Sequence, residues 1–401
     1  MTIQLEGDPV RAYEGESVAV ALFASGVNVL SRSVKYHRPR TFFCLDGHCA
    51  ACFMRVDGVP NLRSCREPVR EGLACERQNA LPSAAFDVLA AADWLFPKGM
   101  DHHTLLAKQP LLRPVLHKVV RELGGLGHLA DAPPAEIPKV VRRNVEVLIV
   151  GGGPAGLGCA QAAARRGRQV VLVDEDDVLG GSLLAEPKSG ADKLAADARA
   201  AGAELLTRST ALAWFPEENL LAVQTPTGLQ KITAQKTVYA TGAYDQNVLC
   251  EDNDRPGVFA GRAVGRLVHR YGVRPGARVA VVGGWNYAER LAPALEAAGI
   301  GVVRAAEIVR VHGSRWVESV ELPGGARQEC DAVAACAEPL PASELARQHG
   351  AHVKASRGAF AVEIDSNFAT SVPGVLACGE VTGVSSPARA FEQGAALGER
   401  L

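Results

Sequence analysis

The chain has 401 residues, 47% of them apolar, which is enough for two or three domains with sizeable cores. Its formal net charge of -1 gives no whole-chain signal for nucleic acid or for an acidic membrane surface, so neither is expected as a partner. The charged N-terminus is unlike a secretory signal, and no run reaches the roughly 18 uncharged apolar residues of a membrane span. A cytoplasmic protein is therefore expected.

The first 80 residues predict a small domain with a loop rich in cysteine. Residues 2–13 predict a hairpin with Gly7-Asp8 at its turn, and residues 17–25 predict a helix ending at Gly26. A second hairpin is predicted to turn at Asp57-Gly58. The intervening loop and this hairpin carry four of the ten cysteines. In a chain without an export signal, this distribution favours metal or redox use over disulfides.

The spacing of these four cysteines is C-x4-C-x2-C-x12-C, and the first three match the ligand run of plant-type ferredoxins. Small residues at Gly47, Ala50 and Ala51 would let the loop curl round a [2Fe–2S] cluster. The alternative is a four-cysteine zinc site, which is disfavoured because paired CxxC motifs are absent. His48 could replace a thiolate, but four cysteines are already present, so it is expected to face solvent. The predicted metal ligands are Cys44, Cys49, Cys52 and Cys65.

Residues 81–143 give a weak pattern and are predicted to be a linker region with short helices. One helix is predicted over 112–123, and the proline-rich stretch 131–138 predicts a stiff, extended connection. The adjacent His102 and His103 lie on an irregular segment, and we do not predict them to be catalytic.

Residues 146–175 predict a strand, a glycine turn, a helix and a second strand. The apolar strand 147–150 leads into the turn from Gly151 to Gly156, which has the GxGxxG pattern of dinucleotide-binding folds. The first glycine allows the tight turn, Gly153 leaves room for a pyrophosphate, and Gly156 lets the helix approach the sheet. Asp174 ends the second strand, where its carboxylate could bond a ribose hydroxyl, with Glu175 as the fallback. A glycine turn in some other α/β protein is the alternative.

Three later segments are predicted to approach the same nucleotide. These are the second glycine turn 179–182, the turn 240–243 after a meander of strands over 204–232, and the strand 375–378 that leads to Glu380. Ser386-Pro387 then predicts a helix start, whose N-terminus would favour negative charge on a flavin. The predicted nucleotide-binding residues are Gly151, Gly153, Pro154, Ala155, Gly156, Asp174, Glu175, Gly181, Ser182, Thr241, Gly242, Gly379 and Glu380, and no catalytic residue is predicted.

Residues 278–307 repeat the strand, turn, helix and strand pattern. Here Trp285 stands where Gly153 stands in the first copy, and Ala288 stands in the place of Gly156. A tryptophan where backbone must meet a pyrophosphate would block the usual pose. This segment is therefore interpreted as a nicotinamide-domain fold that has lost its nicotinamide site.

The glycine fingerprint, the turn at Thr241-Gly242 and the late Gly379-Glu380 resemble the flavoprotein disulfide-reductase superfamily. No CxxC follows the first fold, so a disulfide reductase is not expected. The cysteine loop and the segments SVKYHRPR, FPKGMDHH, VDEDDVLGGSLL and EDNDRPGVFAGRAV are together similar to the α subunit of heterotetrameric sarcosine oxidase. The same subunit type occurs in proline and hydroxyproline dehydrogenases, opine oxidases and hydrogen cyanide synthase.

This resemblance implies an α/β and α+β fold in four parts. They are a β-grasp ferredoxin-like domain (1–80), the linker region (81–143), a disulfide-reductase-type FAD-binding Rossmann domain (144–250 and 340–401), and an inserted nicotinamide-domain-like Rossmann fold (251–339). Sarcosine oxidase α subunits continue into a folate-binding region, whereas this chain ends at Leu401, so folate chemistry is not expected.

The resemblance also implies the cofactors and partners. FAD is favoured in the first nucleotide site, where family members also place NAD or ATP, and an FMN can lie at a subunit interface. Substrate oxidation in the family belongs to a β subunit resembling D-amino-acid oxidase, and a small accessory subunit can be present.

The chain is thus expected to be an electron-transfer subunit of a heteromeric amine or imino-acid dehydrogenase or oxidase, acting on a sarcosine- or proline-like substrate. The alternatives are a stand-alone NAD(P)H-dependent flavin reductase, against which Trp285 argues, and a redox-silent nucleotide-binding scaffold.

Overall fold

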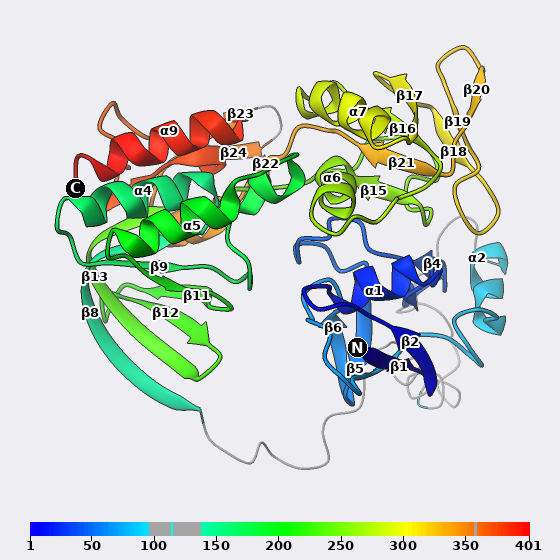
Figure 1. The fold of residues 1–401 in the computed structure, drawn as a ribbon, viewed down its shortest axis with the longest axis horizontal. Helices are drawn as coiled ribbons and strands as arrows, with labels where there is room; N and C mark the ends of the chain where they lie inside the picture. The colour runs from blue at the N-terminus through cyan, green and yellow to red at the C-terminus, as the bar shows by residue number, and fades with distance from the viewer. Residues whose placement is uncertain (96–113, 115–137, 357–358) are drawn as a thin grey trace. The chain divides into compact units, whose positions relative to one another are not determined.

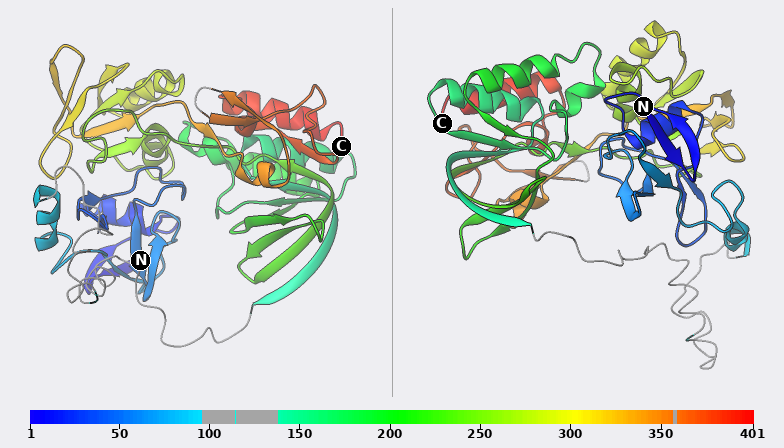
Figure 2. Two further views of the ribbon diagram at one scale, coloured as in Figure 1. Left: turned by 180° about the vertical axis from the view of Figure 1, so that it is seen from behind. Right: turned by 60° about the horizontal axis from the view of Figure 1, so that its bottom comes forward.

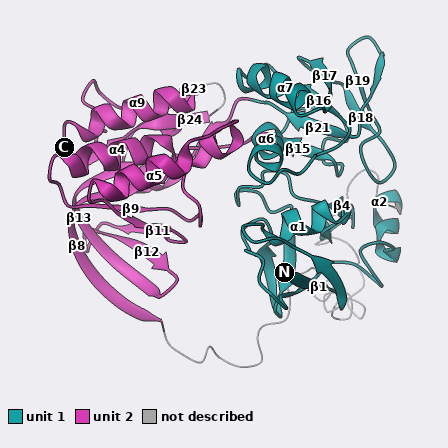
Figure 3. Ribbon diagram, viewed as in Figure 1, with its two compact units in different colours: residues 1–133, 247–337 teal, residues 134–246, 338–401 magenta. Residues whose placement is uncertain are grey.

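The computed structural model describes residues 1–95, 114, 138–356 and 359–401. The chain divides into two compact units (Figure 3), one made of residues 1–133 and 247–337, the other of residues 134–246 and 338–401. The N-terminal segment and the inserted fold therefore belong to one unit. His102, His103, the predicted helix 112–123 apart from residue 114, and the predicted linker 131–138 up to residue 137 lie outside the described residues.

A five-stranded sheet forms the N-terminal part of the first unit. Its strand order is β2-β1-β7-β5-β6, with β1 and β7 parallel and the other pairs antiparallel. Both predicted hairpins and the predicted helix are confirmed. The core of this part contains the buried side chains of Ile3 from β1, Leu22 from α1 and Met54 from β5. The elements are β1 (Thr2–Leu5), β2 (Asp8–Arg11), α1 (Val18–Ala24), β5 (Phe53–Val56), β6 (Val59–Arg63) and β7 (Ala74–Glu76).

Short elements flank this sheet and lead towards the undescribed segment. A buried hydrogen bond joins His37 Nδ1 to Asp87 Oδ2 at 2.8 Å and connects the two loops that carry these residues. The elements are β3 (Ser31–Arg32), β4 (Pro39–Arg40), the 3-10 turn η1 (Val88–Ala90) and α2 (Ala91–Leu95).

The inserted fold completes the first unit. Its four parallel strands have the order β15-β21-β16-β17, and a separate antiparallel sheet has the order β18-β19-β20. The strand, turn, helix and strand predicted over residues 278–307 are confirmed: β16 and β17 are the strands and α7 is the helix. The elements are β15 (Val258–Ala260), α6 (Gly261–His269), β16 (Arg278–Val282), α7 (Tyr287–Ala297), β17 (Gly301–Ala305), β18 (Arg310–His312), β19 (Ser319–Glu321), β20 (Arg327–Glu329) and β21 (Ala332–Ala335).

The second unit is built on a seven-stranded sheet. Its order is β10-β9-β8-β13-β12-β11, and β25 pairs with the end of β13. Strands β10, β9, β8, β13 and β25 run parallel, whereas β13, β12 and β11 form an antiparallel meander. The meander predicted over 204–232 is therefore confirmed from residue 210 on, while residues 204–206 form the parallel strand β10 instead. The helices α4, α5 and α9 cover one face of this sheet (Figures 1 and 2). The elements are β8 (Lys139–Val150), α4 (Pro154–Arg165), β9 (Val170–Val173), α5 (Ala191–Ala200), β10 (Glu204–Leu206), β11 (Thr210–Phe215), β12 (Leu220–Thr225), β13 (Gly228–Tyr239), β25 (Val375–Ala377) and α9 (Pro387–Gly398).

Strand β8 begins eight residues earlier than the apolar run at Val147 indicates. Its first half, starting at Lys139, is exposed and carries charges, so its sequence resembles a linker. It is a strand because its backbone pairs in register with β13, where Lys139 lies opposite Gly228. The pairing partner, which lies far along the chain, decides this boundary.

The remaining elements of the second unit surround the carboxyl ends of its parallel strands or extend its surface. They are η2 (Gly181–Ala185), β14 (Ala243–Tyr244), β22 (Leu340–Pro341), α8 (Glu344–Gln348), β23 (Val353–Ser356), β24 (Ala359–Val362) and η3 (Gly379–Thr382). Strand β14 pairs with β22, and β23 pairs with β24.

Candidate functional site

The four predicted metal ligands lie together as two pairs of thiols. The Cys44 thiol donates to Cys49 Sγ at 3.4 Å, and the backbone N–H of Cys49 donates to Cys44 Sγ at the same distance. Cys52 and Cys65 form the second hydrogen-bonded pair. Cys49 is partly exposed, while the other three are buried.

The hydrogen bond within each pair shifts the pKa values of its two thiols in opposite directions. The hydrogen bond from Cys44, aided by backbone N–H groups, lowers the pKa of Cys49 to about 5, and the same bond raises the pKa of Cys44 well above its ordinary value. Likewise the pKa of Cys52 is lowered and that of Cys65 is raised by the bond between them. Since thiolates are the ligands of iron and zinc, the lowered pKa values of Cys49 and Cys52 favour the form that binds metal.

The paired arrangement of the four thiols suits a two-iron centre. A [2Fe–2S] cluster is held by four cysteines, and here Cys44 pairs with Cys49 and Cys52 pairs with Cys65.

Arginine side chains hold the cysteine loop in its curled form. Gly47 has a φ of +73°, and a side chain there would meet the guanidinium of Arg66. Arg66 Nη2 donates to the Asp46 carbonyl oxygen at 2.8 Å, and Arg63 Nη1 donates to the Gly47 carbonyl oxygen. The side chain of His48 is 24% exposed, and its Nε2 lies 3.2 Å from Asp46 Oδ2.

The first glycine turn of the second unit joins β8 to α4. Gly151 has a φ of +108°, and a Cβ there would clash with the Ala240 carbonyl oxygen. A Cβ on Gly156 would clash with the Gly151 carbonyl oxygen. The turn is therefore packed between α4 and the end of β13, with Gly153 as N-cap of the helix and Pro154 and Ala155 in its first turn. This exposes helix N–H groups to an anion at the turn.

Asp174 lies at the end of β9, against the same turn. Its carboxylate accepts hydrogen bonds from the backbone N–H of Gly152 at 2.5 Å and of Asp176 at 2.8 Å. Asp174 is half-buried, whereas Glu175 is exposed. The position of Asp174 beside the glycine turn fits the ribose-binding role better than the exposed position of Glu175 does.

The second glycine turn faces the first. A Cβ on Gly153 would lie 4.0 Å from the Cα of Gly181, so the two turns face each other with no side chain between them. Gly181 begins η2, and Ser182 in the same turn is buried. The two glycine turns thus pack against each other through their backbones, and a Cβ on Gly181 would lie 3.0 Å from the Cα of Gly153.

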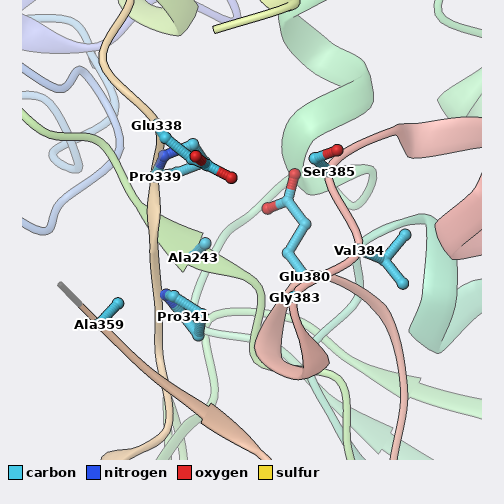
Figure 4. A pocket seen from close by; sticks show the side chains of 9 residues that line it. All are labelled: Ala243, Glu338, Pro339, Pro341, Ala359, Glu380, Gly383, Val384 and Ser385. Atoms are coloured by element: carbon cyan, nitrogen blue, oxygen red, sulfur yellow. The ribbon is translucent and has the colours of Figure 1, made fainter. Parts of the chain in front are cut away.

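Of the remaining predicted residues, Glu380 lines a pocket in the second unit (Figure 4). Glu380 is only 8% exposed, and a Cβ on Gly242 would lie 3.8 Å from its Oε2. Thr241 Oγ1 donates to the Ala342 carbonyl oxygen at 2.6 Å, and the Gly379 N–H donates to Gln393 at 2.6 Å, so these two residues fix the backbone. The pocket is lined by Ala243, Glu338, Pro339, Pro341, Ala359, Glu380, Gly383, Val384 and Ser385.

Glu338 is a pocket residue that the sequence analysis missed. Figure 4 shows its side chain pointing toward the space that Glu380 and Ser385 also face. The residue lies where the chain returns from the inserted fold, between β21 and β22. Its sequence signal is weak, because an acidic residue before Pro339 is ordinary for a loop.

The turn after β16 in the inserted fold is filled by Trp285. The indole is 8% exposed, and its ring lies 5.1 Å from the ring of Tyr287. The guanidinium of Arg262 lies 5.6 Å from the indole centroid. This packing supports the interpretation that the turn does not accept a pyrophosphate.

None of the helices in the described part of the chain combines the length and apolar character that a bilayer crossing requires.

Comparison with known families matches both parts of the chain. Residues 1–80 match the family described as 2Fe-2S iron-sulfur cluster binding domain. Residues 145–288 and 285–394 match the family described as pyridine nucleotide-disulphide oxidoreductase. The second match spans more than half of the 401 residues, so the chain belongs to the pyridine nucleotide-disulphide oxidoreductase family. It is an oxidoreductase chain whose two folds use a [2Fe–2S] cluster and FAD.

Within this family, the chain is similar to α subunits of sarcosine oxidase. It is 31% identical over 386 residues to sarcosine oxidase subunit alpha of Rhizobium meliloti (strain 1021), covering 84% of this chain and 39% of that protein. The corresponding subunit of Corynebacterium sp. (strain P-1) is 29% identical, with 76% of this chain and 30% of that protein covered. The chain therefore spans well under half the length of these relatives.

Two solved structures support the fold assignment. L-proline dehydrogenase from P. horikoshii has a TM-score of 0.76 and 25% identity, covering 99% of this chain and 72% of that one. Thioredoxin reductase from T. acidophilum has a TM-score of 0.52 and 21% identity, covering 64% of this chain and 97% of that one. The predicted fold class, an N-terminal 2Fe–2S domain followed by a disulfide-reductase-type Rossmann fold, is confirmed.

Proposed function

We propose that this chain is the electron-transfer subunit of a heteromeric dehydrogenase or oxidase that acts on a secondary amine or imino acid, such as a sarcosine- or proline-like substrate. The observation that carries the proposal is the pairing of the four thiols in a chain that also holds a complete dinucleotide turn. Relatives named for sarcosine oxidase and opine oxidase, and a structural neighbour named for proline dehydrogenase, support the substrate class.

The residues divide into two sets with separate tasks. Cys44, Cys49, Cys52 and Cys65 hold the cluster, and the glycine turns, Asp174 and the pocket at Glu380 hold the FAD. When both are bound, the flavin exchanges two electrons and the cluster one at a time, which suits a chain that converts between the two. The assignment of these residues, and the domain boundaries given above, form part of the proposal.

We assign substrate oxidation to a partner chain. A flavoprotein β subunit resembling D-amino-acid oxidase would take electrons from the substrate, with FMN at the subunit interface and a small accessory subunit as further components. Glu380 and Glu338 line the candidate pocket, and we assign their carboxylates to the binding of nucleotide hydroxyls. We expect the complex to act in the cytoplasm.

The test is the absorbance spectrum of anaerobically purified protein, with iron, sulfide and the mass of the released nucleotide measured on the same sample. A flavin band with a broad shoulder at longer wavelength, iron, sulfide and FAD are expected. Colourless protein that contains zinc and releases only NAD or ATP would contradict the proposal and favour a scaffold.

A second experiment addresses the stand-alone reductase. Because Trp285 fills the second glycine turn, NADH or NADPH added anaerobically should leave the flavin band unchanged over seconds in a stopped-flow record. Rapid bleaching would favour the reductase instead.

A further inference from the structure

Helix α6 of the inserted fold presents two buried arginines one turn apart. Arg262 and Arg266 are 3% and 1% exposed. Gly261 lets the helix pack closely on its sheet, because a Cβ at this position would clash with Cys336 Sγ. A buried guanidinium is costly unless it is paired and hydrogen-bonded, so the partners of these two side chains indicate what they do.

The partners of Arg266 belong to the cysteine loop of the N-terminal domain. Its Nη2 lies 2.9 Å from Asp46 Oδ2, and its Nη1 donates to the Cys44 carbonyl oxygen at 3.4 Å. Both groups lie in the first turn of the loop, the segment from Cys44 to Cys49. Arg66 contacts the same turn from within the N-terminal domain, through the Asp46 carbonyl oxygen.

Apolar packing beside Arg266 makes this contact part of a core. Phe43 packs against the buried residues of the inserted fold, and its carbonyl oxygen accepts from the Ala260 N–H at 3.0 Å. The rings of Phe42 and Phe259 stack with centroids 5.0 Å apart. The residues that directly precede the first ligand are therefore fixed by the inserted fold.

The charge of Arg266 bears on the chemistry of the loop. Adding an electron to a cluster adds negative charge, and a cation held nearby in a medium of low dielectric stabilises the reduced form. The carboxylate of Asp46 acts in the opposite direction and is partly neutralised by the same guanidinium. Charge and hydrogen bonding near the sulfur ligands are among the factors that set the potentials of these clusters.

We propose that Arg266 is a positioning residue through which the inserted fold holds the first turn of the cluster loop and raises the reduction potential of the cluster. The fold that resembles a nicotinamide domain thereby acts as a second half of the iron–sulfur module. This inference rests on the proposed function, since it requires the four cysteines to hold a cluster.

The test measures the reduction potential of the cluster in the full chain by a redox titration followed by electron paramagnetic resonance. Arg266→Gln should lower the reduction potential of the cluster by at least 59 mV. For a one-electron couple, this shift corresponds to a tenfold change in the equilibrium constant. Asp46→Asn should raise it, and the double variant should lie between the two. Arg270→Gln is the matched control, because it removes the same charge from the C-cap residue of the same helix, and its potential should equal that of the wild type.

The outcomes separate the inference from the proposed function. Equal potentials in Arg266→Gln and Arg270→Gln would overturn the inference while leaving the cluster assignment intact. If Arg266→Gln does not fold, the reduction potential of the cluster in Asp46→Asn tests the inference. An unchanged potential in that variant would overturn it. Wild-type protein without iron and sulfide would overturn the proposed function, and the inference with it.

Discussion

The carboxylate of Asp174 accepts a hydrogen bond from the backbone N–H of Gly152 at 2.5 Å. Asp174→Ala should remove a support of the glycine turn together with the group that we propose binds the ribose. Since a hydrogen bond to a charged group contributes about 1.5–3 kcal/mol, FAD affinity should fall at least tenfold. Titration of the apoprotein with FAD checks this.

Glu175→Ala is the matched control, because the two acids are adjacent and Glu175 is exposed. Its FAD affinity should stay within about threefold of the wild type, which corresponds to less than 1 kcal/mol. A larger loss of FAD affinity in Glu175→Ala than in Asp174→Ala would indicate that Glu175, rather than Asp174, binds the ribose.

Cys49→Ser should abolish the visible and paramagnetic signals of the cluster and leave FAD bound. The cysteine pairs lie in the unit of residues 1–133 and 247–337, and the glycine turn lies in the other unit. Cys250→Ser, the same chemical change outside the cysteine loop, should keep both cofactors. Loss of cluster and FAD together in Cys49→Ser would contradict the independence of the two sites.

Gly156→Ala should destabilise the second unit and reduce its FAD content. The added methyl group would meet the Gly151 carbonyl oxygen, so α4 or the turn must move, at a cost of about 1–3 kcal/mol. Thermal unfolding and FAD content measure this.

Gly284→Ala is the comparison, since no atom lies within 4 Å of a Cβ built there. It should leave both quantities unchanged. Equal effects of Gly156→Ala and Gly284→Ala would show that close approach of α4 is not required.

Stability should fall in acid through His349. Its Nδ1 lies 2.9 Å from the Tyr239 hydroxyl, its ring stacks on Trp214, and burial lowers its pKa from 6.5 to about 4. Between these two pH values the unfolded chain binds a proton that the folded chain does not, so stability is full above pH 6.5 and declines as the pH falls towards 4. After allowance for solvent screening, the loss should be about 1–2 kcal/mol.

Denaturant unfolding at pH 7.5 and at pH 4 measures this loss, and His349→Gln removes the titrating group. The variant should be less stable at pH 7.5, since Tyr239 loses its partner, and its stability should change less between the two pH values. An identical pH dependence in the variant would assign the effect to other groups.

Local sequence determined the parts of the fold that local chemistry specifies. The first glycine turn, the cysteine spacing and the Ser386-Pro387 helix start were all readable, because positive φ, ligand spacing and helix capping depend on a few consecutive residues. The start of β8 at Lys139 was missed, since those residues become a strand only by pairing with Gly228 and its neighbours.

Tertiary structure alone decided which distant groups meet. Nothing near Arg266 in the sequence points to Cys44, more than two hundred residues away, and nothing near Glu338 points to Glu380. A buried charge takes its role from the partners that packing brings to it, and those partners come from other parts of the chain. The sequence by itself therefore determined which cofactor chemistries the chain carries, while the packing of the inserted fold on the cysteine loop determined the electrostatic surroundings in which one of them works.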